Sequence, residues 1–259
     1  MITIVHRSFM DVVKSVGELA LMTSRTLVYI FKGNVDRRNV VEQMLEVGVR
    51  SFPVIALTSV FTGMVMALQT GAAFRNIFNE PVYVGSVVGF AIVKELGPVL
   101  TSIVISGRVG AAIAAELGSM KVTEQLDALY TLGTNPVKYL AVPRFIANLV
   151  MLPILALCAN IIGIVGGMLV TVYKWGVPST VYWDDILDHM DIGDLMHGLI
   201  KSLAFALIIV SVSCYKGFAC EGGAEGVGKT TTGAVMISMV MILVSDYFIS
   251  SFLVAIGIG

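Results

Sequence analysis

Five long apolar segments, separated by shorter polar connections, dominate the pattern of this 259-residue chain. A helix that crosses a bilayer needs roughly 20 mostly apolar residues, whereas the strands of a membrane barrel would appear as ~10-residue segments of alternating polarity. The chain has the first pattern. It therefore predicts an all-α polytopic membrane protein, with spans at about residues 52–74, 82–106, 142–173, 195–215 and 232–256.

The first 51 residues differ, because apolar side chains recur there at helical spacing between charged ones. The apolar positions of residues 8–31 are Phe9, Val12, Val13, Val16, Leu19 and Ala20. Such a helix suits the plane of the membrane surface, although an ordinary soluble helix hairpin fits the pattern equally well. A polar break at 32–39 leads to a second short amphipathic stretch that ends at Pro53. We expect an N-terminal interfacial region, residues 1–51, and one transmembrane domain, residues 52–259.

Composition supports the membrane assignment and excludes other classes. Hydrophobic residues make up 56% of the chain and charged residues 14%, which leaves too little polar surface to cover a water-soluble globule of this size. The net charge of −1 gives no general attraction to nucleic acid. The three cysteines are odd in number and lie in or beside apolar stretches, so we interpret them as small hydrophobic side chains and predict no metal site.

The distribution of Lys and Arg predicts the topology. Residues 1–50 carry seven, and the connections 107–144 and 216–231 carry four and two. The connections on the other side contain only Arg75 and Lys174. Basic residues concentrate on the cytoplasmic side of membrane proteins. The N-terminus is therefore expected in the cytoplasm, and five crossings place the C-terminus outside.

The connection between the third and fourth spans is amphipathic. One side has Trp183, Ile186, Leu187 and Met190, and the other has Asp184, Asp185, Asp188, Asp191 and Asp194. The pattern fits a solvated helical lid, and it also fits a docking surface for an external partner.

Residues 223–230 match the phosphate-binding pattern G-x-x-x-x-G-K-[ST] in every position. A nucleotide site of this kind needs a strand before the loop and a helix after it. Here a predicted span, 195–215, precedes the loop, and the next apolar run lies within the last span. We therefore reject nucleotide binding and expect a tight glycine-rich cytoplasmic turn.

The most informative region extends from Lys94 to Arg144. Pro98 lacks a backbone donor and should kink its helix near Lys94, whose carbonyl loses its partner. The amphipathic segment 121–132 then lies between two spans on the cytoplasmic side, and Asn135 followed by Pro136 is typical of a helix start. Such a crosswise segment could transmit force from a soluble subunit, or it could be a merely structured loop.

The chain resembles the permease subunit of the MlaE (YrbE-like) family in the stretches ELGPVL, GRVGAAIAAELG, VTEQLDAL and NPVKYLAVPR, and also in GMVMALQ, GGAEGVGKTTT and SDYF. These stretches cover nearly the whole chain in one order. The resemblance implies the homodimeric membrane core of an ABC transporter in the bacterial inner membrane. That core would move phospholipids between the inner and outer membranes and so maintain outer-membrane lipid asymmetry.

The resemblance also implies partners and a coupling segment. The partners would be a cytoplasmic ATPase that binds ATP and magnesium, a small STAS-domain subunit and a hexameric periplasmic ring of MCE domains. This chain itself would be no enzyme and would hold no cofactor. The VTEQLDAL stretch corresponds to the coupling helix that docks into the ATPase, and its named positions are Thr123, Glu124, Gln125, Leu126 and Asp127.

Ionisable residues inside spans are costly unless they are paired or hydrated. Those to explain are Lys94, Glu95, Lys201 and Asp246, and their opposite signs suggest internal pairing, such as Lys201 with Asp246. They could fasten the bundle only. They could also line an opening for a lipid headgroup, with lysine attracting phosphate and with Met66, Gln69 and Phe74 on the tail-facing wall.

Two functions other than transport fit the sequence less well. A nucleotide-hydrolysing or lipid-modifying enzyme would have to be built on residues 223–230, whose context is wrong for that chemistry. A membrane anchor for a periplasmic ring would not need the amphipathic cytoplasmic segment 121–132.

Overall fold

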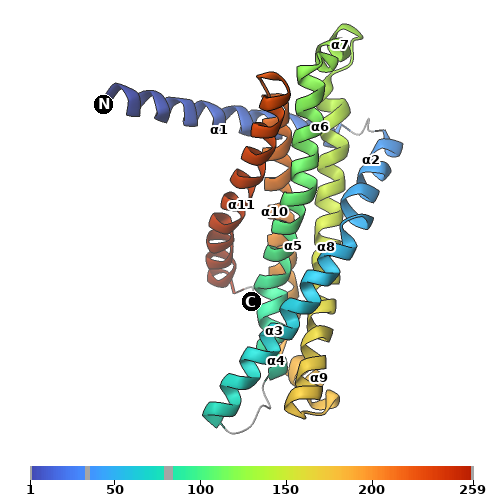
Figure 1. The fold of residues 1–259 in the computed structure, drawn as a ribbon, viewed down its shortest axis with the longest axis vertical. Helices are drawn as coiled ribbons and strands as arrows, with labels where there is room; N and C mark the ends of the chain where they lie inside the picture. The colour runs from blue at the N-terminus through green and yellow to red at the C-terminus, as the bar shows by residue number, and fades with distance from the viewer. Residues whose placement is uncertain (1, 33–35, 79–83, 258–259) are drawn as a thin grey trace. The chain divides into compact units, whose positions relative to one another are not determined.

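The computed structural model describes residues 2–32, 36–78 and 84–257, and every regular element in these ranges is a helix (Figure 1). Short π-helical segments, labelled η, interrupt or extend several α-helices. The elements are α1 (Ile2–Phe31), α2 (Arg37–Met44), η1 (Leu45–Val49), α3 (Phe52–Phe78), α4 (Val84–Phe90), η2 (Ala91–Leu96), α5 (Gly97–Ile105), η3 (Ser106–Gly110), α6 (Ala111–Val122), α7 (Gln125–Thr131), η4 (Val137–Ala141), α8 (Val142–Trp175), α9 (Ser179–His189), α10 (Ile192–Phe218) and α11 (Gly223–Ala255).

Five helical segments are long and apolar enough to cross a membrane, which confirms the predicted fold class. They are Arg37–Asn76, Val84–Val122, Val137–Trp175, Ile192–Phe218 and Gly223–Ala255. All five extend beyond the predicted spans, because charged and glycine-containing turns at their ends are helical as well. Apolarity alone marks the part of a helix that fits the hydrocarbon core, not where the helix begins and ends.

The N-terminal region is helical as predicted over 8–31, and α1 extends this helix toward the N-terminus as far as Ile2. The second amphipathic stretch does not end at Pro53. Its helical residues end at Val49, and Pro53 lies in the first turn of α3, where a missing N–H costs nothing. The predicted polar break is also shorter, because Asp36 accepts a hydrogen bond from the Arg38 N–H and caps α2. Residues 33–35 lie outside the described residues.

The second span contains the predicted distortion beside Pro98. The Gly97 N–H donates to the Ile92 carbonyl, five residues earlier, and the chain forms the π-helical segment η2. In a regular α-helix the ring of Pro98 would clash with the Lys94 carbonyl, and the wider turn avoids this clash. Its predicted end at residue 106 is wrong, since the helix continues to Val122. The charge of Glu116 within this continuation of the helix is paired with Arg144.

Two compact units can be distinguished. Unit 1 comprises residues 1–45, 106–149 and 207–240, and unit 2 comprises residues 46–105, 150–206 and 241–259. Unit 1 therefore contains α1, α6 and α7, and unit 2 contains α3, α4, η2, α5 and α9. The helices α8, α10 and α11 contribute residues to both.

Unit 2 has a dense apolar core between α3, α4 with η2, α8 and α9. Its buried members are Ala67, Val84, Val88, Ile92, Val93, Ile164, Tyr182 and Ile186. The helices α3 and α8 approach closely, because a Cβ on Gly63 would lie only 1.9 Å from the Gly163 carbonyl oxygen. Small residues permit such backbone contact between membrane helices.

The connection after the third span forms α9, which packs on α4 through a polar anchor as well as apolar side chains. The buried Asp185 carboxylate accepts a hydrogen bond from the Ser86 N–H at 2.7 Å, and the Tyr182 hydroxyl donates to the Ile164 carbonyl. Burial raises the pKa of the Tyr182 phenol, so that it remains a donor. The predicted division into faces is thus partly wrong. Leu187 is 72% exposed, whereas Asp185 is buried, because the carboxylate supplies the acceptor that the start of α4 requires.

Candidate functional site

The charges inside the spans of unit 2 form one network around Lys201 of α10. This side chain is 0% exposed, and its ammonium group lies 2.8 Å from Asp246 of α11 and 2.5 Å from Glu95 of η2. The predicted pair of Lys201 with Asp246 is therefore confirmed, and Glu95 joins it. The Ser250 hydroxyl, one turn after Asp246, donates to the Asp246 carbonyl oxygen at 2.8 Å and also lies 3.4 Å from the other Glu95 oxygen.

Lys201 also completes the distorted turn of η2. Its ammonium donates to the Lys94 carbonyl oxygen at 3.2 Å, the acceptor that Pro98 was predicted to leave without a partner. The carbonyl oxygen that Pro98 leaves without a backbone donor thus serves as an acceptor for the buried Lys201 ammonium group. An unpaired carbonyl in an apolar interior would cost energy, and a buried ammonium needs several acceptors.

Lys94 itself belongs to a second pair. Its ammonium lies 2.8 Å from Asp194 at the start of α10 and 4.9 Å from the centre of the Phe90 ring. Asp194 also accepts a hydrogen bond from the Asp191 N–H. Both lysines are thus held by carboxylates of their own unit. The most accessible side chain of these groups is that of Glu95, which is 46% exposed, whereas those of Lys94 and Asp246 are 23% and 22% exposed.

The three predicted tail-facing residues on α3 are not equivalent. Met66 and Phe74 pack against the apolar core of unit 2, whereas Gln69 is exposed. The structure therefore brings Met66 and Phe74 together in the packing and separates Gln69 from them.

In unit 1, the predicted crosswise segment is a short helix joined to α6 by a tight turn. The predicted limits 121–132 are too wide, since α7 covers only Gln125–Thr131. Thr123 ends α6, and Glu124 adopts the left-handed conformation with φ of 59°, which reverses the chain direction. Leu126 is buried, and Asp127 lies 3.6 Å from Lys121 at the end of α6.

The outer side of this segment is accessible and partly apolar. Tyr130 is 59% exposed and Leu132 is 78% exposed, and Glu124 and Gln125 are exposed as well. The chain then turns at Gly133, and Asn135 accepts hydrogen bonds from the Val137 and Lys138 N–H groups. This confirms the predicted helix start.

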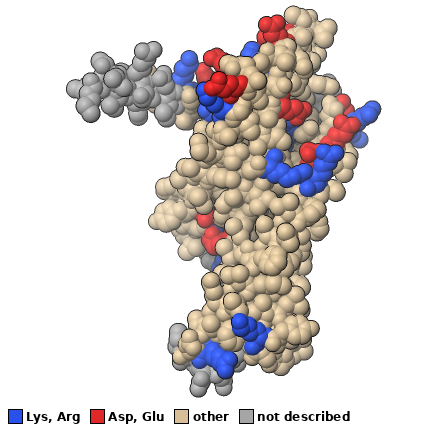
Figure 2. Space-filling view, in the orientation of Figure 1, with Lys and Arg blue, Asp and Glu red and all other residues tan. Residues whose placement is uncertain are grey.

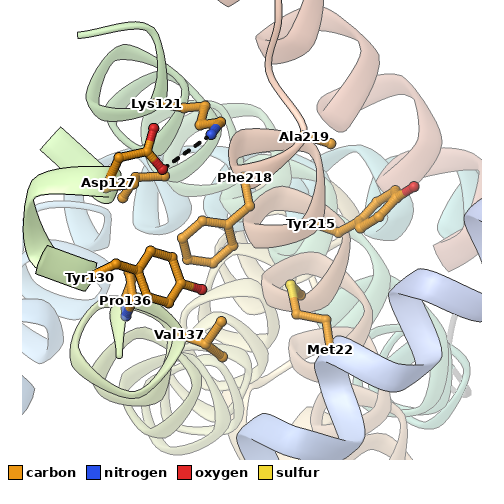
Figure 3. Close-up of a pocket in the computed structure, with 10 residues that line it drawn as sticks. Met22, Lys121, Asp127, Tyr130, Pro136, Val137, Tyr215, Phe218 and Ala219 are labelled. Carbon is orange, nitrogen blue, oxygen red and sulfur yellow. Dashed lines mark ion pairs between the residues drawn. The ribbon is translucent and has the colours of Figure 1, made fainter. Parts of the chain in front are cut away.

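A cavity of about 310 Å³ lies on the other side of α7. Figure 3 shows the side chains of Phe218, Met22 and Val137 pointing into it, with Tyr130 at its edge and the Lys121–Asp127 pair above. The segment is therefore not packed tightly against α1 and α10.

The model of the protein family described as Permease MlaE matches residues 40–252 of the chain. The chain belongs to the MlaE permease family. It is 42% identical to the Probable ABC transporter permease protein RT0041 of Rickettsia typhi over 93% of this chain and 92% of that one. It is 40% identical to the Probable ABC transporter permease protein slr1045 of Synechocystis over 88% of this chain and 87% of the relative. It is also 38% identical to Protein TRIGALACTOSYLDIACYLGLYCEROL 1, chloroplastic, of Arabidopsis thaliana, over 90% of this chain and 66% of the relative.

The phosphate-loop pattern of this MlaE-family permease is helical. Residues 223–230 form the first turns of α11, and Lys229 pairs with Glu225 on the helix surface at 2.7 Å. The expected tight turn is therefore wrong in extent, because Gly223 already begins the helix. A strand before the loop is missing among the described residues, and the segment is helical where a nucleotide site of this kind has a loop.

Sequence reasoning missed three charged residues of this MlaE-family permease. Asp194 was assigned to the solvated side of the external segment, and Glu116 and Arg144 were assigned to a cytoplasmic connection. The spacing of Asp194, two helical turns before Lys201, would place both on one face of a helix and could have indicated its role. The sequence indicates a pairing of Glu116 with Arg144 less clearly, because the two residues are 28 positions apart, although each adjoins an apolar run. In the face of the molecule drawn in Figure 2, basic and acidic side chains lie beside one another in several clusters on a largely uncharged surface.

Proposed function

We propose that this chain is the membrane-spanning permease subunit of an ABC transporter that moves phospholipids between the inner and outer membranes of a bacterium. The match of the MlaE permease family to residues 40–252 of a chain with five possible spans carries the proposal. The printed names of the Rickettsia and Synechocystis relatives support the ABC transporter class. The name of the Arabidopsis relative is that of a diacylglycerol lipid, which supports a lipid as substrate.

ATP hydrolysis is assigned to a separate cytoplasmic subunit, which would bind ATP and magnesium. The exposed Glu124 and Gln125, Leu132 just after α7 and Tyr130 at the edge of the cavity support a docking site for that subunit. Exposed large apolar side chains near one another are typical of a protein contact. The Lys and Arg residues of 1–50 and of the connections 107–144 and 216–231 support a cytoplasmic location for this surface and a periplasmic C-terminus.

We assign the lipid path to unit 2, and the exposure of Gln69 and Glu95 and the partial exposure of Lys94 and Asp246 support this assignment. We assign Lys201 to holding three spans together, since its fully buried ammonium group contacts Glu95, Asp246 and the Lys94 carbonyl oxygen. The remaining partners of the proposal are a second copy of this chain, a STAS-domain subunit and a periplasmic ring of MCE domains. The resemblance of the sequence to the MlaE family supports them.

The experiment is to purify the complex from native membranes, identify the co-purifying subunits, and measure ATP-driven lipid movement after reconstitution. The variant Glu124→Lys reverses a charge on the docking surface, and Tyr130→Ala removes its aromatic side chain. Both should leave the permease folded but lower ATP-driven lipid movement at least about fivefold. Lys229→Glu, an exposed change outside α7, is the control and should change transport less than twofold.

The proposal fails if the purified complex moves no lipid upon ATP hydrolysis. The docking assignment alone fails if both α7 variants transport at the wild-type rate. ATP hydrolysis by this chain purified alone would favour an enzyme in place of a transport subunit, and assembly of a periplasmic ring without any lipid movement would favour an anchor.

A further inference from the structure

An ion pair joins α6, the helix before the α7 segment, to α8, the long helix after it. Glu116 lies on α6, about two turns before the end of that helix, and Arg144 lies at the start of α8. The Arg144 Nη2 atom is 2.8 Å from the Glu116 carboxylate. The chain between these two residues contains α7 and its turns, so that the ion pair closes the base of a hairpin.

Arg144 also binds the backbone of η4, the helical segment through which the chain returns from α7. Its Nη1 atom donates to the Leu140 carbonyl oxygen at 2.8 Å, and Leu140 belongs to the π-helical segment η4. The guanidinium group is thereby fixed at two of its donors in a planar fork, a geometry that lysine cannot reproduce. Its side chain is only 3% exposed, whereas that of Glu116 is 58% exposed.

Beyond the Glu116–Arg144 pair, α6 packs closely against α10, whereas α7 has a cavity on one side. A Cβ on Gly217 of α10 would lie 2.6 Å from Leu117 Cβ, and one on Gly118 would lie 3.3 Å from Cys220 Sγ. Behind α7, by contrast, lies the cavity of about 310 Å³ (Figure 3). Between Lys121 and Asp127 there is only a partly exposed ion pair, and such pairs contribute little.

We propose that Glu116 and Arg144 are positioning residues that make α7 transmit force to α6 and α8 together. A push on α7 can be relieved by movement into the cavity, unless the two helices at its base are held at a fixed separation. The Glu116–Arg144 pair supplies that constraint. The inference rests on the proposed function and adds to it the element that converts docking of an ATPase into movement of two membrane helices.

The test uses the full complex with its ATPase and measures lipid moved per ATP hydrolysed. Glu116→Gln removes the charge of the accessible partner and keeps an acceptor of similar size. We expect subunit assembly and ATP hydrolysis within about twofold of wild type, with lipid moved per ATP lowered at least about fivefold. Glu225→Gln, which breaks the exposed pair with Lys229, is the matched control and should leave the ratio unchanged.

Arg144→Lys keeps the buried charge but cannot bind Glu116 and the Leu140 carbonyl with the same planar fork, so it should also lower the ratio, by a smaller factor. It covers the case in which Glu116→Gln impairs folding, since the charges of the pair are retained. An unchanged ratio in folded Glu116→Gln overturns the inference, as does a folded Arg144→Lys protein with the wild-type ratio. A wild-type complex that moves no lipid at all would contradict the proposed function, a result distinguishable from both.

Discussion

The charge network of unit 2 and the α7 segment of unit 1 represent opposite ways of holding polar residues. Around Lys201, carboxylates from two other helices and a backbone carbonyl converge on one ammonium group with no exposure. On α7, the charged and aromatic side chains are mostly exposed, and their contacts are with residues close in the chain. The network fixes helices to one another, whereas the segment keeps a surface available.

Function can therefore be altered without loss of the fold at α7 more readily than in the charge network. A buried charge that loses its partner is expensive, because neither water nor another group replaces it. An exposed charge loses little, since water solvates it in either state. Variants of the network should therefore act first on stability, and variants of α7 on the response to a partner.

The largest expected effect comes from breaking the network with Lys201→Met. Two carboxylates and the Lys94 carbonyl would lose their shared donor, so the free energy of unfolding should fall by about 3–5 kcal/mol. Thermal unfolding of the purified permease in detergent would measure it. Lys229→Met, which breaks an exposed pair in unit 1, should change stability by less than about 1 kcal/mol. Equal effects of the two variants would contradict the contrast.

A smaller effect is expected from the close contact of α3 and α8. Gly63→Ala would place a methyl group 1.9 Å from the Gly163 carbonyl oxygen, and the backbone shift should cost about 1–3 kcal/mol. Gly233→Ala on α11 is the counterpart in unit 1, since nothing lies within 4 Å of its added Cβ. It should raise stability by up to about 1 kcal/mol, as alanine favours helix. The same unfolding measurement compares them, and a stable Gly63→Ala protein would show that the contact is adaptable.

The smallest effect concerns the hydrogen bond from Tyr182 to the Ile164 carbonyl. Tyr182→Phe should lower the free energy of unfolding by about 1 kcal/mol, while Tyr173→Phe, an exposed control, should not change it. Because burial raises the pKa of the Tyr182 phenol, the folded state keeps this proton at a pH where the unfolded state loses it. Stability should therefore fall as the pH rises above about 10. Unfolding midpoints at pH 8 and above 10 test this, and an equal decline in Tyr182→Phe would assign it to other groups.

Much of the fold was predictable, since the five spans follow from runs of apolar residues and the helix start at Asn135 follows from local chemistry. The pairing of Lys201 with Asp246 was predictable from opposite charges in apolar spans. Which carboxylate meets which lysine beyond that pair was not, because it depends on how each helix is rotated about its own axis. Helix ends were also missed, as at Val122 and Gly223. Charged residues there look like connections until a partner such as Arg144 for Glu116 is known.

The central claim is that the α7 segment lies in the cytoplasm for a separate ATPase, and labelling of single cysteines tests it most directly. Leu132→Cys lies next to α7, and Leu187→Cys lies on α9. Both positions are more than 70% exposed, and Cys158, Cys214 and Cys220 would be replaced by alanine. In spheroplasts, a membrane-impermeant thiol reagent should label Leu187→Cys at once and Leu132→Cys only after permeabilisation. Labelling of Leu132→Cys in intact spheroplasts would contradict the account.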